Sequence, residues 1–261
     1  MAVVFFDIDG TLWDENMIVP ESTKIAIQKL QENGHKAFIC TGRAMGNVND
    51  PQFDEIGFDG FVAACGNHVE MDGKILYERN MSYEEVKAIY DSSRTHQLPI
   101  IYEGTTHQWL DREGFDGDSY IDYIVEKLKD VAVYLDECEL SDIKANKFSA
   151  LVHENTNYDA IKEELKDRFD FLEHGGGIIE AVPCGTSKAT GIEWFCNYLG
   201  VSIADTYALG DSVNDLEMLQ FVGHGIAMGN ATQVAKDVAE YITTDIHEDG
   251  VLLALRHYNL I

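Results

Sequence analysis

The sequence predicts an α/β protein with a Rossmann-like core of parallel strands, interrupted by an inserted α+β domain. Short apolar strand patterns alternate with helical patterns near both ends of the chain, whereas the middle mixes the two signals. Strands that alternate with helices form β-α-β units, whose strands run parallel. We therefore expect a core built from residues 1–79 and 186–261, with residues 80–185 inserted as a separate domain.

The first elements of the core begin with residues 2–6, a continuous β-branched and aromatic run. Such a run is typical of a strand buried on both faces of a parallel sheet. A helix is expected from Pro20, which suits a first turn, to Asn33-Gly34, which suits a helix end. Strands are predicted next at 37–40 and 61–65.

The C-terminal part of the core repeats this alternation. Helices are predicted at 188–199 and through 216–219, and strands at 206–209 and 225–228. Because both ends of the chain carry the same pattern, we expect them to build one sheet.

The inserted domain is bounded by expected hinges near 79–82 and at 183–186. Its expected helices lie near 83–97, 119–130 and 156–168, and its expected strands near 100–102, 107–110, 131–135, 147–153 and 178–182.

Composition and net charge exclude some classes of binding partner. The hydrophobic share of 45% is enough for a buried core, and 19 Lys+Arg against 46 Asp+Glu give a net charge of −27. Nucleic acid and anionic membranes bind through Lys and Arg, so neither is an expected partner. An anionic substrate would need local positive charge from a metal ion or a few placed cations.

Cysteine usage and the N-terminus favour a cytoplasmic location. The five cysteines are odd in number and include no C-x-x-C pair, so neither a disulfide framework nor a zinc site is indicated. The N-terminus has no basic segment before its apolar run, and no apolar run approaches the roughly 18 residues of a membrane-spanning helix.

Asp7 and Asp9 follow the first buried strand and are the most informative residues. Strand periodicity points both side chains the same way, into the ligand crevice beyond the carboxyl ends of a parallel sheet. Two adjacent carboxylates need a cation or a proton between them. A calcium loop is unlikely because Gly10 stands at position 4 and Ile18 at position 12, although a solvated turn stays an alternative for this segment alone.

Polar groups also follow two other predicted strands. Thr41-Gly42-Arg43 offers a hydroxyl and backbone N–H groups that suit phosphate oxygens, and the segment 210–215 adds Asp211, Asn214 and Asp215. Lys188 begins a predicted helix, where a cation is disfavoured unless an anion lies nearby. Taken singly, these residues could equally be a turn, a helix cap and a surface lysine.

Together these segments resemble the motifs of the haloacid dehalogenase superfamily of phosphotransferases, and more closely its Cof-type branch. The sequence Asp-Ile-Asp-Gly-Thr-Leu at 7–12 resembles the first motif, Thr41-Gly42-Arg43 the second, Lys188 the third and 210–215 the fourth. The resemblance implies that residues 80–185 form the α/β cap that this branch carries. One departure is Gly66-Asn67-His68, where many members have Asn-Gly-Ala.

The resemblance also implies a role for each motif residue. Asp7 would be the nucleophile that forms an aspartyl-phosphate, and Asp9 the general acid and base. Phosphate would be held by Thr41, Gly42, Lys188 and Asn214. Mg²⁺ would be held by Asp7, Asp9 (through its backbone carbonyl) and Asp211, with Asp215 in support.

The function expected from these roles is Mg²⁺-dependent hydrolysis of small phosphorylated metabolites, sugar phosphates in particular. The protein would act as a monomer or homodimer, without nucleic acid or membrane partners. Two alternatives stay open. A phosphomutase of the same fold would return the phosphoryl group to its substrate, and a catalytically silent module would bind metal or phosphate without turnover.

Overall fold

The chain forms two compact units in the computed structural model, which describes residues 1–48, 50–115, 121–122, 125–126 and 131–261. The first unit comprises Met1–Gly42, Asn49–Tyr77 and Ser187–Ile261, and the second comprises Arg43–Val48 and Glu78–Thr186. Arg43–Val48 lies within the range expected to be core but packs in the second unit, so the division differs from the expected one there. None of the helices in the described ranges is both long and apolar enough to cross a membrane.

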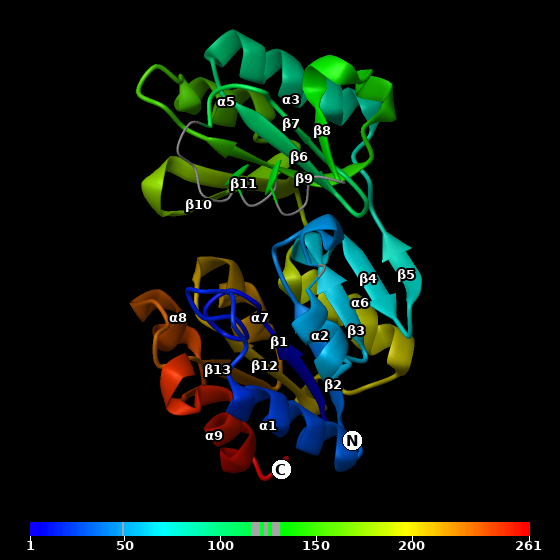
Figure 1. Cartoon of the computed structure of the whole chain (residues 1–261), viewed down its shortest axis with the longest axis vertical. Helices are drawn as coiled ribbons and strands as arrows, with labels where there is room; N and C mark the ends of the chain where they lie inside the picture. The colour runs from blue at the N-terminus through cyan, green and yellow to red at the C-terminus, as the bar shows by residue number, and fades with distance from the viewer. Residues whose placement is uncertain (49, 116–120, 123–124, 127–130) are drawn as a thin grey trace. The chain divides into compact units, whose positions relative to one another are not determined.

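The first unit is built on an eight-stranded sheet with the order β14-β13-β12-β1-β2-β3-β4-β5 (Figure 1). The central strand β1 pairs in parallel with β12 on one side and β2 on the other, as expected for a Rossmann-like core. The strands are β1 (Val3–Phe6), β2 (Lys36–Cys40), β3 (Gly60–Ala63), β4 (His68–Met71), β5 (Lys74–Glu78), β12 (Thr206–Gly210), β13 (His224–Ala227) and β14 (Tyr241–Ile242).

The helices of the first unit pack on this sheet and bury its aromatic core. Phe38 of β2 contacts Phe5 of β1 and Phe195 of α6, at ring-centroid distances of 5.7 Å and 4.3 Å. Burying each ring stabilises the fold by about 1.5–3 kcal/mol. The helices are α1 (Glu21–Glu32), α2 (Pro51–Ile56), α6 (Lys188–Leu199), α7 (Leu216–Phe221), α8 (Gln233–Val238) and α9 (Gly250–His257).

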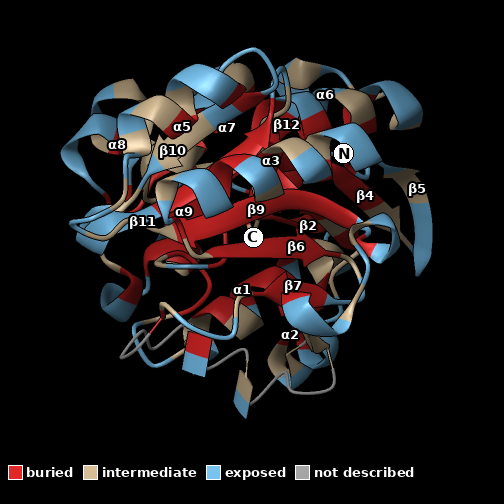
Figure 2. Cartoon of the chain, turned by 90° about the horizontal axis from the view of Figure 1, so that it is seen from above, coloured by how far each residue is buried: buried red, intermediate tan, exposed pale blue. Residues whose placement is uncertain are grey.

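The second unit is an α+β domain with a six-stranded sheet of order β10-β11-β9-β6-β7-β8. The helices α3 and α5 lie side by side over one face of the sheet, whose central strands β6 and β9 are buried (Figures 1 and 2). The elements are α3 (Tyr83–His96), α5 (Tyr158–Leu165), β6 (Ile100–Gly104), β7 (Gln108–Leu110), β8 (Ala132–Tyr134), β9 (Ala145–Leu151), β10 (Phe169–Glu173) and β11 (Ile178–Pro183).

A buried ionic cluster lies on the other face of the sheet of the second unit. Phe148 packs in the core cluster that includes α3 and α5 residues, so the preceding Lys147 points the opposite way. Lys147 forms a close ion pair with Glu180 and lies 3.4 Å from Glu103 Oε1. Asn47 Nδ2 donates to Glu103 Oε2 at 3.1 Å, which ties Arg43–Val48 to this cluster.

The predicted fold class is confirmed. The structure also contains elements that were not predicted from the sequence, and one predicted element lies largely outside the described residues. Most of the predicted helix 119–130 lies outside the described residues. The sequence patterns did not predict the strands β10 and β14, the helices α2, α8 and α9, or the hairpin of β4 and β5. Asp72-Gly73 connects the hairpin with φ values of 50° and 69°, the left-handed backbone of a two-residue turn. Asp-Gly between strand patterns is a hairpin signal that the sequence contains.

Candidate active site

Three neighbouring strand ends assemble the predicted site. In the parallel register, Phe6 of β1 stands beside Leu209 of β12 and Ile39 of β2. Asp7 therefore leaves the sheet at the same edge as Thr41 and Asp211, the edge at which open parallel sheets bind ligands.

The loop after β1 places Asp7 in the interior. Asp7 is only 3% exposed, and its N–H donates to Leu209 O at 3.0 Å. The loop closes on itself, since Gly10 N–H donates to Trp13 O at 2.9 Å and Trp13 N–H to Ile8 O at 2.8 Å. Gly10 has a φ of +75°, and a Cβ there would collide with the carboxylate of Asp211. Glycine at this position thus lets Asp211 reach the loop.

Lys188 is the cation of the site. It is the first residue of α6, and its Nζ donates to Asp7 Oδ1 and Asp215 Oδ1, each at 2.6 Å, and to Asn214 Oδ1 at 3.3 Å. Burial by itself lowers the pKa of Lys188, but the carboxylates of Asp215 and Asp7 outweigh it and raise the pKa well above its ordinary value. Lys188 therefore stays charged inside the protein.

Asp215 supports both Lys188 and Asp211. One carboxylate oxygen accepts from Lys188, and the other accepts the backbone N–H groups of Asp211 at 2.9 Å and Ser212 at 3.0 Å. Both oxygens are thus occupied by donors.

Asp211 carries the unsatisfied oxygen of the site. Its Oδ1 is buried and has no hydrogen-bond partner among the residues described. Burial, followed by the repulsion of Asp215, raises the pKa of Asp211 to about 7, although Lys188 lowers it. A buried carboxylate oxygen without a donor is a position where a cation would be stabilised.

The charge and geometry of the cluster fit a divalent cation. Ligand oxygens of Asp7, Asp211 and Asp215 lie within 4.8 Å of one another. These three carboxylates and the one ammonium of Lys188 leave two uncompensated negative charges in a buried place. Burial and then Asp215 raise the pKa of Asp7 well above its ordinary value, and a bound cation would oppose that shift. Carboxylate oxygens are the ligands that Mg²⁺ prefers.

The other predicted residues lie at the same edge with different exposure. Asp9 is exposed, and its carboxylate is outside the set of oxygens just described. Thr41 is 1% exposed, its N–H donates to Val62 O at 2.8 Å, and its carbonyl accepts from Cys65 N at 3.2 Å. Gly42 follows it and is also buried.

Two positioning residues were missed from the sequence. Asn230 Nδ2 donates to Gly10 O at 2.7 Å, so it holds the loop after β1. The N–H of Thr232 donates to Asp211 O at 2.8 Å, so it holds the backbone of Asp211. Both residues follow β13, and the rule that polar groups gather beyond parallel strand ends could have identified them.

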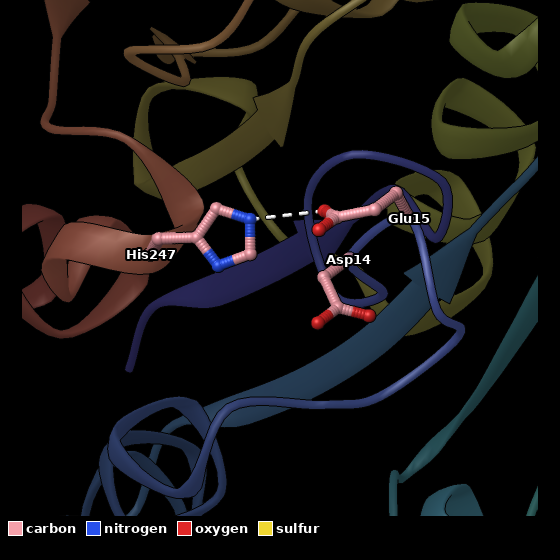
Figure 3. Close-up of side chains that lie close together, drawn as sticks. All are labelled: Asp14, Glu15 and His247. Atoms are coloured by element: carbon pink, nitrogen blue, oxygen red, sulfur yellow. Dashed lines mark hydrogen bonds and ion pairs between the residues drawn. The ribbon is translucent and has the colours of Figure 1, made fainter.

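A second group of possible ligand side chains, Asp14, Glu15 and His247, lies at the surface (Figure 3). His247 Nε2 lies 3.0 Å from Glu15 Oε2, and the hydrogen bond to Glu15 raises the pKa of His247. Asp14 Oδ1 instead accepts the backbone N–H groups of Asn16 and Ile18, at 2.8 Å and 2.9 Å. These contacts describe an exposed ion pair beside a turn, which contributes little stability.

Comparisons with known proteins identify the family of this chain. Residues 4–255 match the family described as haloacid dehalogenase-like hydrolase. YkrA of Bacillus subtilis (strain 168), provisionally named a phosphatase, is 30% identical over 99% of this chain and 98% of its own length. YitU of the same strain, named 5-amino-6-(5-phospho-D-ribitylamino)uracil phosphatase, is 29% identical over 98% of this chain and 97% of its own length. The solved structure of the subclass IIB sugar phosphatase BT4131 has the same fold, with a TM-score of 0.84 and 24% identity over 100% of both chains.

Proposed function

Because this chain belongs to the haloacid dehalogenase-like hydrolase family and is a phosphatase of that family, we propose that it hydrolyses the phosphomonoesters of small metabolites, with Asp7 as the nucleophile. The observation that carries the proposal is the position of the buried Asp7 carboxylate, 2.6 Å from the ammonium of Lys188 and beside the unsatisfied Asp211.

The reaction follows from the roles of two carboxylates. An oxygen of Asp7 attacks phosphorus, the bond from phosphorus to the leaving oxygen breaks, and an aspartyl-phosphate forms. Asp9 protonates the leaving alcohol and then accepts a proton from the attacking water. Water displaces the Asp7 carboxylate from phosphorus, which releases inorganic phosphate and restores the free enzyme.

Charge compensation is assigned to the residues around Asp7. Lys188 orients Asp7 and faces the phosphoryl oxygens, with further contacts from Thr41, Gly42 and Asn214. Mg²⁺ would be held by the carboxylates of Asp7 and Asp211 and by the carbonyl of Asp9. When bound, it would supply positive charge that stabilises the transferring phosphoryl group.

The substrate class is inferred from charge and from a relative. A chain with a net charge of −27 repels extended polyanions, so a small substrate that presents one phosphate to the buried ammonium of Lys188 is favoured. The name of YitU describes a phosphorylated ribityl compound as its substrate, which supports sugar and sugar-alcohol phosphates here.

Residues 80–185 are assigned as the cap domain. The absence of a disulfide pattern in the sequence supports a cytoplasmic location.

Phosphate release from a panel of sugar, sugar-alcohol, nucleotide and cofactor phosphates tests the proposal. Release should require Mg²⁺, stop with a chelator, be largest for a sugar or sugar-alcohol phosphate, and be absent in Asp7→Asn. An isomerised product without free phosphate would identify a phosphomutase instead. Mg²⁺ binding without turnover on any substrate would identify a binding module.

A further inference from the structure

The strand β5 forms one margin of the eight-stranded sheet and carries an exposed apolar strip. It is the last strand in the sheet order, and its residues are all exposed or intermediate (Figure 2). Ile75 is 53% exposed. Tyr77 contacts Trp194 of α6 at a ring-centroid distance of 5.7 Å, and Trp194 stacks on Tyr198, which is 58% exposed. An edge strand flanked by exposed apolar side chains is a surface suited to pairing with another strand.

The hairpin turn determines which backbone groups of β5 face outward. Asp72-Gly73 is a two-residue loop with left-handed φ values. In hairpins of this kind the two flanking residues, here Met71 and Lys74, form the hydrogen-bonded pair that closes the turn. Inward and outward groups alternate along a strand, so the N–H and C=O groups of Ile75 and Tyr77 point to the outer edge.

We propose that β5 pairs antiparallel with β5 of a second copy of this chain, about a two-fold axis at Leu76. In this register Ile75 stands opposite the partner's Tyr77, and the two residues exchange backbone hydrogen bonds through their outward groups. Lys74 stands opposite the partner's Glu78, so each copy contributes one cation and one carboxylate. A two-fold interface requires such self-complementarity, and the sequence Lys-Ile-Leu-Tyr-Glu has it.

The charges of β5 itself are compatible with a second copy as the occupant of this edge. Two chains that each carry a net charge of −27 repel each other, so a contact between them needs a locally neutral surface. β5 supplies one, because its only charged residues are Lys74 and Glu78. Glu78 accepts from Asn80 Nδ2 at 3.2 Å and from Thr105 Oγ1, which hold its carboxylate at the end of β5.

Sedimentation equilibrium of charge variants tests the pairing. The wild-type chain should sediment as a dimer. Lys74→Glu places like charges opposite each other at two symmetric positions. It should raise the dissociation constant of the dimer at least tenfold, which corresponds to roughly 1.4 kcal/mol. Lys74→Glu combined with Glu78→Lys restores opposite charges and should restore the dimer. A monomeric wild type, or a dimer that Lys74→Glu leaves unchanged, would overturn the proposal.

Disulfide trapping tests the register independently. Only the residue on the two-fold axis faces its own copy, and the Cα atoms of a non-hydrogen-bonded antiparallel pair lie about 4.5 Å apart, within reach of a disulfide. Leu76→Cys should therefore form a covalent dimer under mild oxidation, whereas Ile75→Cys, the matched control, should form no more than the wild type. Equal cross-linking of both variants, or none by Leu76→Cys, would contradict this interface.

Discussion

Lys188 Nζ lies 2.6 Å from Asp7 Oδ1, although 181 positions separate the two residues in the chain. A lysine at the first position of a helix is unfavourable by itself, because the helix dipole repels it. Here the nearby carboxylates of Asp7 and Asp215 offset the repulsion by the helix dipole. The contact joins the beginning of α6 to the end of β1, and through Asp215 it also fixes the segment that carries Asp211.

Lys188→Met should lower kcat/KM by about 10²–10³-fold, because it removes a placed positive charge that acts on the transferring group. The variant should stay folded, since the buried carboxylates can take up protons instead. Lys87→Met is the matched control. Lys87 lies on the surface of α3 in an exposed pair with Asp91, so activity should be unchanged. Steady-state kinetics on the best substrate measures both, and near-normal turnover by Lys188→Met would contradict the assigned role.

Asp211 should make the stability of the metal-free protein depend on pH. Its pKa is about 7 in the folded state against 3.8 as the ordinary value, so the folded protein binds this proton more tightly than the unfolded chain. The stabilising contribution is complete at low pH and is lost as the pH rises through about 7. Asp211→Asn should therefore raise the free energy of unfolding at pH 8 by roughly 2 kcal/mol without metal, and much less at pH 5.

With Mg²⁺ present, the wild type should instead be more stable than Asp211→Asn, because Mg²⁺ binds the wild type and stabilises only its folded state. Thermal unfolding with chelator and with Mg²⁺, at both pH values, measures the two effects. A variant that is less stable than the wild type at pH 8 without metal would show that Asp211 is not electrostatically strained.

A comparison of Gly10→Ala with Gly34→Ala separates the cost of backbone strain from the effect of a collision with the Asp211 carboxylate. Both glycines have positive φ values, +75° and +81°, so alanine costs about 1–2 kcal/mol of stability at either position. Nothing lies within 4 Å of the Cβ position at Gly34, whereas the Cβ at Gly10 meets Asp211. Gly10→Ala should also weaken the binding of Mg²⁺, as measured by calorimetry, and Gly34→Ala should not. Equal Mg²⁺ affinity in the two variants would exclude this role of Gly10.

Lys147→Met should destabilise the protein by about 3–5 kcal/mol, because it leaves the buried carboxylates of Glu103 and Glu180 without their cation. Lys166→Met is the control, since its pair with Glu163 is exposed and contributes less than about 1 kcal/mol. Urea unfolding measures both variants. A loss for Lys147→Met as small as that of the control would mean that the buried cluster does not depend on its lysine.

The central site could be predicted because its residues follow strands with clear sequence patterns. Asp7 and Asp211 come directly after buried apolar runs, and parallel pairing then requires them to meet. The helix predicted at 188–199 has those bounds in the structure, because Ser187 caps it and Gly200 ends it in a left-handed conformation. The resemblance to the haloacid dehalogenase superfamily, which is confirmed, added roles that position alone does not give.

The features of the site and the core that the sequence did not predict depend on how the folded chain packs. Asn230 follows a strand, which could mark it as a residue of the sheet edge, but its hydrogen bond to Gly10 joins residues 220 positions apart and has no sequence signal. The buried Lys147 likewise owes its place to Glu103 and Glu180 on neighbouring strands, since a lysine within a strand is ordinarily exposed. The raised pKa of Asp211 is a further case, because its largest cause is burial, which depends on the packing of the whole site.

Trapping the phosphorylated enzyme tests the central claim most directly. Acid quenching during turnover of a substrate labelled in its phosphoryl group should leave label on the protein, and hydroxylamine should release it, as expected for an acyl phosphate. Peptide mapping should place the label on Asp7, and Asp7→Asn should retain the fold by circular dichroism but show neither label nor turnover. Label on another residue, or phosphate release by folded Asp7→Asn, would contradict the assignment of Asp7 as the nucleophile.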